Sequence, residues 1–369
     1  MTRRTPWALA RAERVYRLTH DARDWLDLDG VPVMYLPYRI ALPFWSQGWT
    51  YRASMLRAAQ RIRREFPFDI VHAHTAYLDG SAGLAIARRF GAKLAITEHT
   101  GPFSILMENS IVRRWTIRSL SGASRIIAVS QAQRHAVMER LPPAARRLSI
   151  VLPNVVDTDL FHPPESWRPD PTAPRIVFVG YFVPIKNLPL LLEAFRIVLS
   201  RIAGARLTLV GGGENREQEH ALAQRVREMN LSPQVDILGH QPRHEIARLL
   251  RESCDVLVLS SRSETFGCVL TEALSCGKPV VATRCGGPED IISTAEVGML
   301  CANDSATELA ERLIEVCKNL PGYDPRVIRA RAMERFGGRA VAEKIGEVYR
   351  SILALPDHLD SPAPVAYKK

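Results

Sequence analysis

Two glutamates eight residues apart, Glu264 and Glu272, are the residues of this sequence whose type and spacing most suggest chemistry. If the segment between them is helical, their side chains are separated by about 12 Å along the axis and by about 80° around it. Carboxyl pairs that cleave a glycosidic bond lie about 5 Å apart in retaining enzymes and up to about 9.5 Å apart in inverting ones. The spacing therefore disfavours a hydrolytic pair and favours carboxylates that hold two ends of an extended ligand.

The segment between the glutamates has the pattern of a helix N-terminus. A strand-like run ends at Ser261, and the apolar spacing of residues 269–274 suits a helix that packs on a sheet. The first backbone amides of such a helix lack partners and favour a bound anion such as phosphate. The expected amide donors run from residue 265 to residue 270 and include Thr265, Phe266, Gly267, Cys268 and Val269. The competing interpretation is a surface helix with two solvated glutamates.

The residues that follow carry a resemblance to a known family. Residues 273–283 read Ala-Leu-Ser-Cys-Gly-Lys-Pro-Val-Val-Ala-Thr, and residues 286–290 read Gly-Gly-Pro-Glu-Asp. Together with the two glutamates they resemble the donor site of glycosyltransferase family 4, whose members are retaining enzymes with the GT-B fold. The resemblance implies that Glu264 holds hydroxyls of the donor sugar and that Glu272 holds the ribose hydroxyls, as suits carboxylates, which accept from hydroxyls.

A second part of the resemblance runs from Gly180 to Lys186, between a strand-like run and an apolar helix. The family holds the donor diphosphate there with a glycine, an arginine and a lysine, so the resemblance makes Gly180 and Lys186 donor-binding residues. It also gives Lys186 a catalytic role, the neutralisation of the leaving diphosphate. Tyr181 stands at the arginine's position, which removes a bidentate contact unless Arg262 or Arg284 substitutes. The alternative for Lys186 is a surface lysine without a ligand.

Two further donor-side positions follow from the same resemblance. Gly213 belongs to a glycine turn that ends a strand and opens a helix, and glycines there allow close approach of the backbone to a ligand. His240 follows Leu238-Gly239 and resembles the segment whose backbone meets the nucleotide base. An ordinary loop histidine is the alternative for His240.

His99 is the third predicted catalytic residue, beside Lys186 and Glu264. It lies in Thr97-Glu-His-Thr-Gly-Pro102, which resembles the family's histidine loop facing the cleft, so it is expected to touch the transferred sugar or the acceptor. A histidine that only caps the strand end is the alternative. No metal site is predicted, because His72 and His74 lack a third ligand and the acidic pairs at residues 27–29 and 157–159 lie outside the expected site. No cofactor is expected, and the nucleotide-diphosphate sugar is a co-substrate.

Strand-like and helical runs alternate twice along the chain, with a break between them. The strand-like runs of the first half are residues 31–37, 70–73, 93–97, 125–130 and 148–152, those of the second half are residues 175–180, 207–210, 235–238, 255–259, 279–282 and 297–301, and residues 324–355 form a helical tail. Five prolines between residues 163 and 174 interrupt the alternation and predict a domain linker. The expected fold is α/β of the GT-B type, with two doubly wound Rossmann-like domains facing a cleft. Residues 1–165 are the expected acceptor-side domain, residues 166–355 the expected donor-binding domain with a C-terminal crossover helix, and residues 356–369 a flexible tail.

Composition limits the classes of protein that this chain can belong to. Its 369 residues are 46% hydrophobic and 24% charged, which is typical of globular proteins. The six cysteines all fall in the second half without metal-ligand spacing, so they are expected to be buried thiols. The sequence has neither an apolar run of membrane-spanning length nor the apolar core of a signal peptide, so a cytoplasmic location is expected.

The net charge of +10 is uneven along the chain. Residues 1–165 hold 23 Lys and Arg against 14 Asp and Glu, a balance of +9, which leaves +1 for the remainder. Because no nucleic-acid-binding pattern accompanies this charge, nucleic acid is not an expected partner. The expected partners are a nucleotide-sugar donor, a glycan, glycolipid or other hydroxyl acceptor, and an anionic membrane that the basic first domain contacts at the inner face. Ordinary solvated charge is the alternative.

The N-terminus differs from the family's usual pattern. The family begins with a strand and a glycine-rich loop, whereas residues 1–30 show no strand-like run and no Gly-Gly pair precedes residue 211. We expect an N-terminally incomplete acceptor domain or a misplaced start. The main hypothesis is a retaining hexosyl- or N-acetylhexosaminyltransferase of polysaccharide or glycolipid synthesis. A nucleotide-sugar-binding protein without transfer activity is the alternative, and an epimerase or phosphorylase has no specific support.

Overall fold

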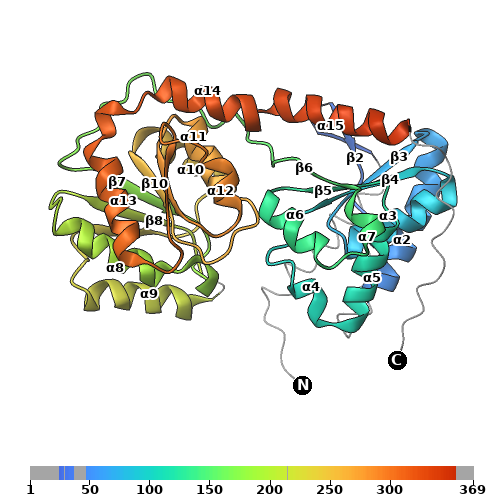
Figure 1. Cartoon of the computed structure of the whole chain (residues 1–369), viewed down its shortest axis with the longest axis horizontal. Coiled ribbons are helices and arrows are strands. Elements are labelled where there is room, and N and C mark those ends of the chain that lie inside the picture. Colours follow the sequence, from blue (N-terminus) through green and yellow to red (C-terminus); the bar gives the residue numbers. More distant parts are fainter. Residues whose placement is uncertain (1–24, 29, 37–46, 214, 355–369) are drawn as a thin grey trace. The chain divides into compact units, whose positions relative to one another are not determined.

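The computed structural model describes residues 25–28, 30–36, 47–213 and 215–354 (Figure 1). The chain divides into two compact units. The first unit takes its residues from Met1–Thr97, Leu106–Ile126 and Leu141–Leu148. The second takes them from Glu98–Ile105, Ile127–Arg140 and Ser149–Lys369. No helix of the described residues is both long enough and apolar enough to span a membrane.

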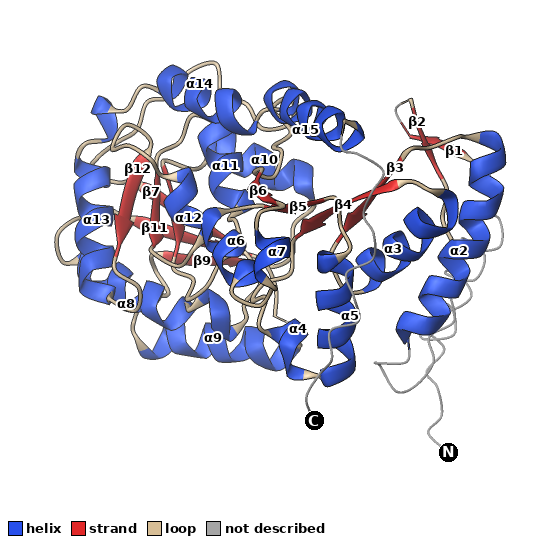
Figure 2. Cartoon of the chain, turned by 45° about the vertical axis from the view of Figure 1, so that its right-hand side comes forward, coloured by secondary structure: helices blue, strands red, loops and turns tan. Residues whose placement is uncertain are grey.

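The first parallel sheet contains four strands that the sequence predicts. Its strand order is β3-β4-β5-β6, and β3 pairs with β4 in parallel with Ile70 opposite Lys93 and His74 opposite Thr97 (Figure 2). The strands are β3 Ile70–His74, β4 Lys93–Glu98, β5 Arg125–Ala128 and β6 Ser149–Val151. The accompanying helices are α2 Gln47–Glu65, α3 Leu78–Phe90, α4 Ile105–Glu108, α5 Ser110–Ser121, α6 Gln131–Met138 and α7 Pro143–Arg146.

The second sheet has six parallel strands in the order β12-β11-β10-β7-β8-β9. The strands are β7 Arg175–Val179, β8 Arg206–Val210, β9 Val235–Leu238, β10 Val256–Leu259, β11 Val280–Thr283 and β12 Gly298–Cys301. The chain moves outward from β7 in one direction through β8 and β9, and from β10 in the other through β11 and β12. The boundary between β7 and β10 is therefore a topological switch point, where open parallel sheets bind ligands beyond the carboxyl ends of their strands.

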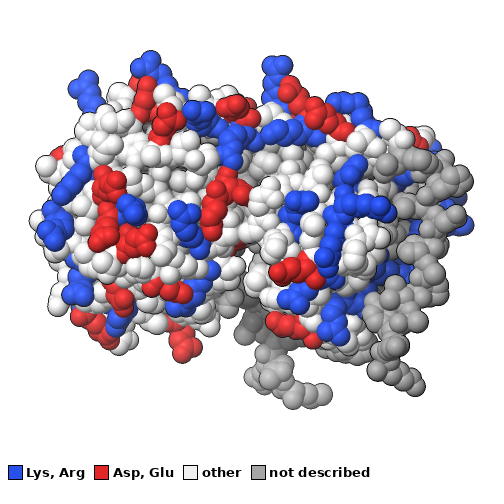
Figure 3. Space-filling model, viewed as in Figure 1, with Lys and Arg blue, Asp and Glu red and all other residues white. Residues whose placement is uncertain are grey.

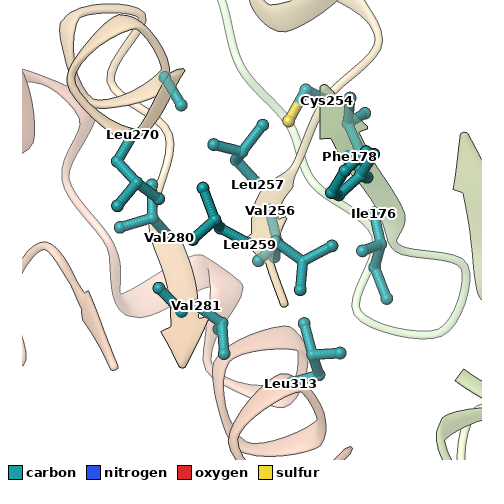
Figure 4. Packing of buried hydrophobic residues seen from close by; sticks show 14 of the residues in the cluster. Ile176, Phe178, Cys254, Val256, Leu257, Leu259, Leu270, Val280, Val281 and Leu313 are labelled. Atoms are coloured by element: carbon teal, nitrogen blue, oxygen red, sulfur yellow. The ribbon is translucent and has the colours of Figure 1, made fainter. Parts of the chain in front are cut away.

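The core of the second unit forms because its central strands are apolar on both faces. Val256, Leu257 and Leu259 of β10 are almost wholly buried among Ile176, Leu313 and their neighbours (Figure 4). Such continuous apolar strands are typical of parallel sheets covered on both sides. The helices of this unit are η2 Pro184–Lys186, α8 Leu188–Leu199, α9 Arg216–Glu228, α10 Arg243–Glu252, α11 Cys268–Ser275, α12 Gly287–Ile291, α13 Ala306–Lys318, η3 Leu320–Gly322, α14 Pro325–Phe336 and α15 Gly338–Leu353.

The hairpin near the N-terminus corrects one sequence prediction. β1 Leu26–Leu28 pairs antiparallel with β2 Val31–Val33 in a separate two-stranded sheet, so the prediction that residues 1–30 hold no strand was wrong. The reason is local: Gly30 adopts a left-handed φ of 82°, and its amide donates to Asp27 Oδ1 at 2.7 Å. Asp27 thus closes a turn. Residues 1–24, where the family's first strand and loop were sought, lie outside the described residues.

The C-terminal helical run is broken once, at Gly337. α14 ends at Phe336, and Gly337 is extended with φ −66° and ψ 150° before α15 begins. The break is bridged by Val156, which precedes the proline-rich linker: the Val156 amide donates to Phe336 O at 2.9 Å, and Val156 forms an isolated parallel bridge with Gly337. The predicted single helical tail is therefore two helices separated by one bridged residue.

Candidate functional site

The turns that leave β7 and β8 lie in direct contact, and glycine makes this possible. Gly211 has a φ of 145°, and a Cβ added to it would lie 1.8 Å from Gly180 O. The Gly180 amide donates to Val210 O at 2.9 Å, and the Gly211 amide donates to Leu238 O at 3.2 Å. Backbone from the ends of β7, β8 and β9 therefore forms one continuous edge of the second unit. Gly180, which the resemblance makes a donor-binding residue, lies in this edge.

Lys186 and Glu264 meet across the switch point. Lys186 ends η2, which follows β7, and its Nζ forms an ion pair with Glu264 Oε1, which follows β10. The Ser261 hydroxyl donates to the same carboxylate oxygen at 2.9 Å, and the Ser260 hydroxyl donates to Lys186 O at 2.8 Å. The two side chains are only 22% and 12% exposed. Two residues predicted for different parts of the donor thus converge on one point.

Glu264 is fixed in place by the loop between β11 and α12. Its amide donates to Cys285 O, and the Gly287 amide donates back to Glu264 O, both at 2.9 Å. Gly286 has a φ of 118°, and its amide donates to Glu289 Oε2 at 3.0 Å. A Cβ on Gly287 would lie 2.2 Å from Phe266 O. The Gly-Gly-Pro-Glu segment, residues 286–289, therefore packs closely against the Glu264 turn and is hydrogen-bonded to it.

The segment between Glu264 and Glu272 is helical only from Cys268 onward. α11 starts at Cys268 because Gly267 is left-handed, with a φ of 104°, and residues 264–267 are not helical. The helical separation derived for Glu264 and Glu272 therefore does not apply. The Leu270 amide already donates to Gly267 O at 2.9 Å, so it is not available to an anion. Phe266 is buried, with its ring edge-on to Phe336 at 5.8 Å between centroids.

The remaining residues of this segment differ in exposure. Thr265 and Val269 are half-buried, whereas Cys268 is exposed and its Sγ accepts from Asn154 Nδ2 at 3.6 Å. Cys268 is thus the exposed side chain of this segment, whereas the buried Phe266 anchors the segment to the core.

Glu272 is a largely buried carboxyl that lies beside a cationic side chain, Arg243. It lies on α11, its side chain is 17% exposed, and Arg243 Nη2 at the start of α10 lies 3.5 Å from its Oε1. Burial raises the pKa of Glu272 to about 7, an effect that Arg243 only partly opposes. Sequence reasoning missed Arg243 and Ser261. The signal for Arg243 was its place three residues after His240, in the loop already assigned to the nucleotide base.

Gly213 and His240 lie on the loops after β8 and β9. A Cβ on Gly213 would lie 2.7 Å from Asn215 O, and the Gly213 amide lies 3.3 Å from Glu219 Oε1. His240 is exposed. Because the β8 and β9 ends are joined through the Gly211 amide, both residues belong to the same edge as Gly180.

The loop that carries His99 belongs to the second unit and lies against the Glu264 turn. A Cβ on Gly101 would lie 1.8 Å from Thr265 Oγ1, and the Ser130 hydroxyl donates to Thr265 O at 2.7 Å. The loop is folded onto itself, because the Thr100 amide donates to Glu98 Oε1 at 2.6 Å. His99 is therefore close in the fold to the residues after β10, although 165 positions separate Glu264 from it in the chain.

The two arginines expected to replace the family's arginine differ in position. Tyr181 is exposed, as a surface residue beside Gly180. The Arg262 amide donates to Ile185 O at 2.8 Å, next to Lys186, and its Nε donates to Asp304 Oδ1 at 3.1 Å. Arg284 instead lines a separate cavity of about 330 Å³ with Met299 and other residues of the β12 side. Arg262 is thus the better placed of the two.

The described residues contain no group of three or more His, Cys, Asp and Glu side chains arranged to hold a metal ion. His72 Nε2 lies 2.7 Å from Thr97 Oγ1, and its ring stacks on His74 with centroids 4.6 Å apart. Asp157 Oδ1 accepts from the amides of Asp159 and Leu160, so it closes a turn. These residues have local structural partners.

Comparison with known proteins agrees with this geometry. The family model described as "Glycosyl transferases group 1" matches residues 163–332, and that of "Glycosyltransferase Family 4" matches residues 4–160. A D-inositol 3-phosphate glycosyltransferase of Frankia alni is 31% identical over 360 residues, which cover 89% of this chain and 83% of the relative.

Two solved structures share the fold. Anabaena HepE in complex with UDP and glucose superposes with a TM-score of 0.69 at 22% identity, covering 87% of each chain. Sucrose-phosphate synthase of Thermosynechococcus elongatus superposes with a TM-score of 0.73 at 21% identity, covering 90% of this chain and 86% of that one.

The two Rossmann-like sheets and these similarities define the GT-B class of glycosyltransferases. Within that class, the chain belongs to glycosyltransferase family 4, as the resemblance of its donor-site residues predicts.

Proposed function

We propose that this glycosyltransferase transfers a sugar from a nucleotide-diphosphate donor to an acceptor hydroxyl with retention of anomeric configuration. The observation that carries the proposal is the ion pair between Lys186 and Glu264 at the switch point of the second sheet. Each partner can be released to a donor: the ammonium to the diphosphate and the carboxylate to hydroxyls of the sugar. The glycine edge formed by Gly180 and Gly211 gives backbone access beside them.

The other site residues receive roles along the same donor. Glu272 accepts from the ribose hydroxyls, with Arg243 beside it. The amides around Gly267 and Cys268 face the diphosphate, and His240 and Gly213 lie toward the base. His99 touches the transferred sugar or the acceptor. Arg262 binds the diphosphate in place of the family's arginine, whose position Tyr181 occupies. To do so, Arg262 exchanges its hydrogen bond to Asp304 for one to phosphate.

In the proposed reaction the leaving diphosphate carries the developing negative charge, and Lys186 and the α11 N-terminus stabilise it electrostatically. No residue of the described site is assigned as a covalent nucleophile. Departure and attack on the same face of the sugar, with the diphosphate assisting removal of the acceptor's proton, account for retention. The charge on the diphosphate is met by protein groups, so the proposed mechanism uses no metal.

Relatives narrow the choice of substrates. The HepE structure contains UDP and glucose, which favours a uridine-diphosphate hexose donor for this chain. The Frankia relative is named a D-inositol 3-phosphate glycosyltransferase, which supports a phosphorylated acceptor for this chain. We propose a phosphorylated or lipid-linked hydroxyl acceptor of cell-surface glycan synthesis, since the first half of the chain is basic.

The proposal is tested by donor binding and by turnover. Calorimetry with UDP, GDP and ADP is expected to give binding for one of them, and K186A is expected to weaken it by about tenfold or more, the loss of a charged hydrogen bond. K318A, which removes an exposed lysine at the end of α13, is the matched control and leaves affinity unchanged. Binding of none of the three nucleotides would overturn the proposal.

Turnover separates transfer from binding alone. Release of nucleoside diphosphate from UDP-glucose in the presence of acceptor is expected, with E264Q lowering kcat by about a hundredfold, as for loss of a transition-state contact. NMR of the product is expected to show the anomeric configuration of the donor. The alternative, a nucleotide-sugar-binding protein, predicts the same binding in the first experiment and no release in the second.

A further inference from the structure

A cavity of about 90 Å³ opens among α2, α3 and α5, and all its described lining residues belong to the first unit. Roughly 10–15 Å³ suffices for one water, so a group of several heavy atoms fits. The lining residues are Trp49, Arg52, Ser81, Leu84, Ala85, Arg88, Arg114, Trp115, Arg118 and Ser119. The cavity combines two kinds of surface, cationic and aromatic, that the proposed transfer reaction does not use.

Four arginines from three helices line this cavity. Arg52 comes from α2, Arg88 from α3, and Arg114 and Arg118 from α5. Within the described part of the chain, no ion pair involves any of the four. Four like charges around one cavity repel one another, so a bound anion lowers the free energy of the arrangement. Planar guanidinium groups bind phosphate oxygens bidentately.

Two tryptophans form the aromatic part of the lining. The rings of Trp49 and Trp115 meet edge to face, with centroids 4.8 Å apart and planes at 80°. Gly48 permits the contact, because a Cβ there would lie only 3.0 Å from Trp115 Cζ3. Trp49 remains 60% exposed. An exposed indole beside a cationic cavity suits a ligand with an anionic head and an apolar body.

The surrounding surface strengthens the attraction. Lys and Arg side chains gather over the part of the molecule that carries α5 and α7 (Figure 3). The excess of basic residues in the first half of the sequence is therefore visible as surface charge. Such a field raises the local concentration of anions and speeds their arrival.

We propose that this cavity is a binding site for a phosphate group, held by Arg52, Arg88, Arg114 and Arg118 and flanked by Trp49. The phosphate is carried by an anionic lipid headgroup or is free in solution. In the first case the site anchors the first unit to an anionic membrane, with Trp49 at the headgroup level. In the second case the site binds a small phosphorylated molecule. The chemistry of recognition is the same in both.

The test uses the full chain and two matched double variants. R88Q/R114Q removes two cavity arginines, and R89Q/R113Q removes the same charge from neighbouring positions of the same helices. Arg89 and Arg113 are exposed and do not line the cavity. One arm follows tryptophan fluorescence during titration with inorganic phosphate and with phenyl phosphate. The other follows co-sedimentation with phosphatidylcholine vesicles, with and without phosphatidylglycerol.

We expect R88Q/R114Q to weaken binding by about tenfold or more in at least one arm, since each guanidinium contributes charged hydrogen bonds. R89Q/R113Q is expected to bind like the unaltered protein. A85L, which fills the cavity and keeps all four arginines, is expected to reproduce the loss. If R88Q/R114Q loses binding only to the soluble phosphates, the ligand of the cavity is a small phosphorylated molecule. If it loses binding to the vesicles, the ligand is an anionic lipid headgroup of a membrane.

Two results would overturn the proposal. The first is equal weakening by both double variants, which shows diffuse attraction to a basic surface. The second is the absence of binding to every phosphate probe and vesicle. Because neither arm contains a nucleotide, failure here leaves the proposed transfer reaction unaffected.

Discussion

Glu272 is a residue whose charge near neutral pH decides what it can bind. Burial raises its pKa to about 7, so a large share of the apo protein carries it protonated at pH 6. Ribose hydroxyls donate best to the ionised form, so we expect affinity for a nucleotide sugar to rise about tenfold from pH 6 to pH 8. Calorimetry in buffers of different ionisation enthalpy measures both the affinity and the proton released.

The control for this prediction is E272Q, whose affinity is expected to be lower and independent of pH over the same range. A nucleotide sugar is used because its diphosphate does not titrate there. Unfolding gives a second readout. A carboxyl with a raised folded-state pKa contributes stability at low pH that is lost as the pH rises through 7, so E272Q is expected to gain up to roughly 3 kcal/mol relative to the unaltered protein between pH 4 and pH 8. An unchanged pH slope in E272Q would contradict the assignment.

Lys278 is a fully buried lysine of the Gly-Lys-Pro-Val-Val segment. No described residue accepts a hydrogen bond from its Nζ, which lies 4.8 Å from the centroid of the Trp167 ring. Burial lowers its pKa to about 8. The folded state therefore disfavours the bound proton, and this residue destabilises the protein below pH 8. We expect K278M to raise the free energy of unfolding by roughly 3 kcal/mol at pH 7 and by progressively less from pH 8 to pH 10.5.

The comparison of K278M with the unaltered protein removes a complication from the cysteines. Burial raises the pKa of Cys276 and Cys317 to about 12, so these thiols lower stability as the pH rises above about 8.5, the value of an unfolded thiol. For Cys317, whose pKa Lys278 does not influence, that effect is common to both proteins and cancels in their difference. Lys278 lowers the pKa of Cys276, so the contribution of this thiol cancels only below about pH 8.5, where it is protonated in the folded and the unfolded state. Urea denaturation under reducing conditions gives the two free energies. If the difference between the unfolding free energies of K278M and the unaltered protein stays constant from pH 7 to pH 10, Lys278 is not desolvated.

At the scale of elements, Arg329 connects α14 to residues 158–161 and to the end of α11. Arg329 donates to Phe161 O at 2.9 Å, to Ser275 O at 2.8 Å and to Thr158 O at 3.0 Å. R329M leaves three carbonyls without this donor, and we expect the free energy of unfolding to fall by roughly 3 kcal/mol. R326M is the control on the same helix, because the Arg326 side chain is 93% exposed. An equal fall in the free energy of unfolding in both variants would show that the charge of the helix, and not the three hydrogen bonds of Arg329, stabilises α14.

The sequence predicted these elements well where a strand or helix is specified by its own residues. All ten strands of the two parallel sheets fall on predicted apolar runs, because buried parallel strands are apolar throughout. β2 lies on a predicted strand, but β1 and its pairing were missed, since β1 is exposed and a single Asp27 bond closes the turn. The break at Gly337 was also missed, because its cause, the Val156 bridge, lies 181 positions away in the chain.

In the site too, features specified by local residues could be predicted, whereas contacts between distant segments could not. Glu264 and Lys186 were singled out from the sequence as site candidates, but their mutual ion pair could not be predicted, because it depends on β7 and β10 being neighbours in the sheet. The conditional helix across residues 264–272 does not form over its whole length, because a left-handed Gly267 cannot be told from a helical glycine in sequence. Arg243 was missed since its partner Glu272 lies on another helix.

At the scale of the molecule, the two units contain different natural probes of unfolding. The six cysteines all lie beyond residue 253, and Trp167 is the one tryptophan beyond residue 115. Thiol labelling therefore follows the second unit, and in W167F tryptophan fluorescence follows the first. The buried cluster of the second unit draws on residues 129–336 alone, so this unit has its own core.

This division allows the location of donor binding to be tested in the whole chain. Ligand that binds only a folded unit stabilises it by about 2.7 kcal/mol at a hundredfold excess over Kd. If the nucleotide binds the second unit, the denaturant midpoint from thiol labelling is expected to rise with UDP or UDP-glucose, while the fluorescence midpoint of W167F stays constant. Inorganic phosphate at the same ionic strength is the control for general anion effects. A shift of the fluorescence midpoint alone would place the nucleotide on the first unit and contradict the assignment of Lys186, Glu264 and Glu272 to the donor.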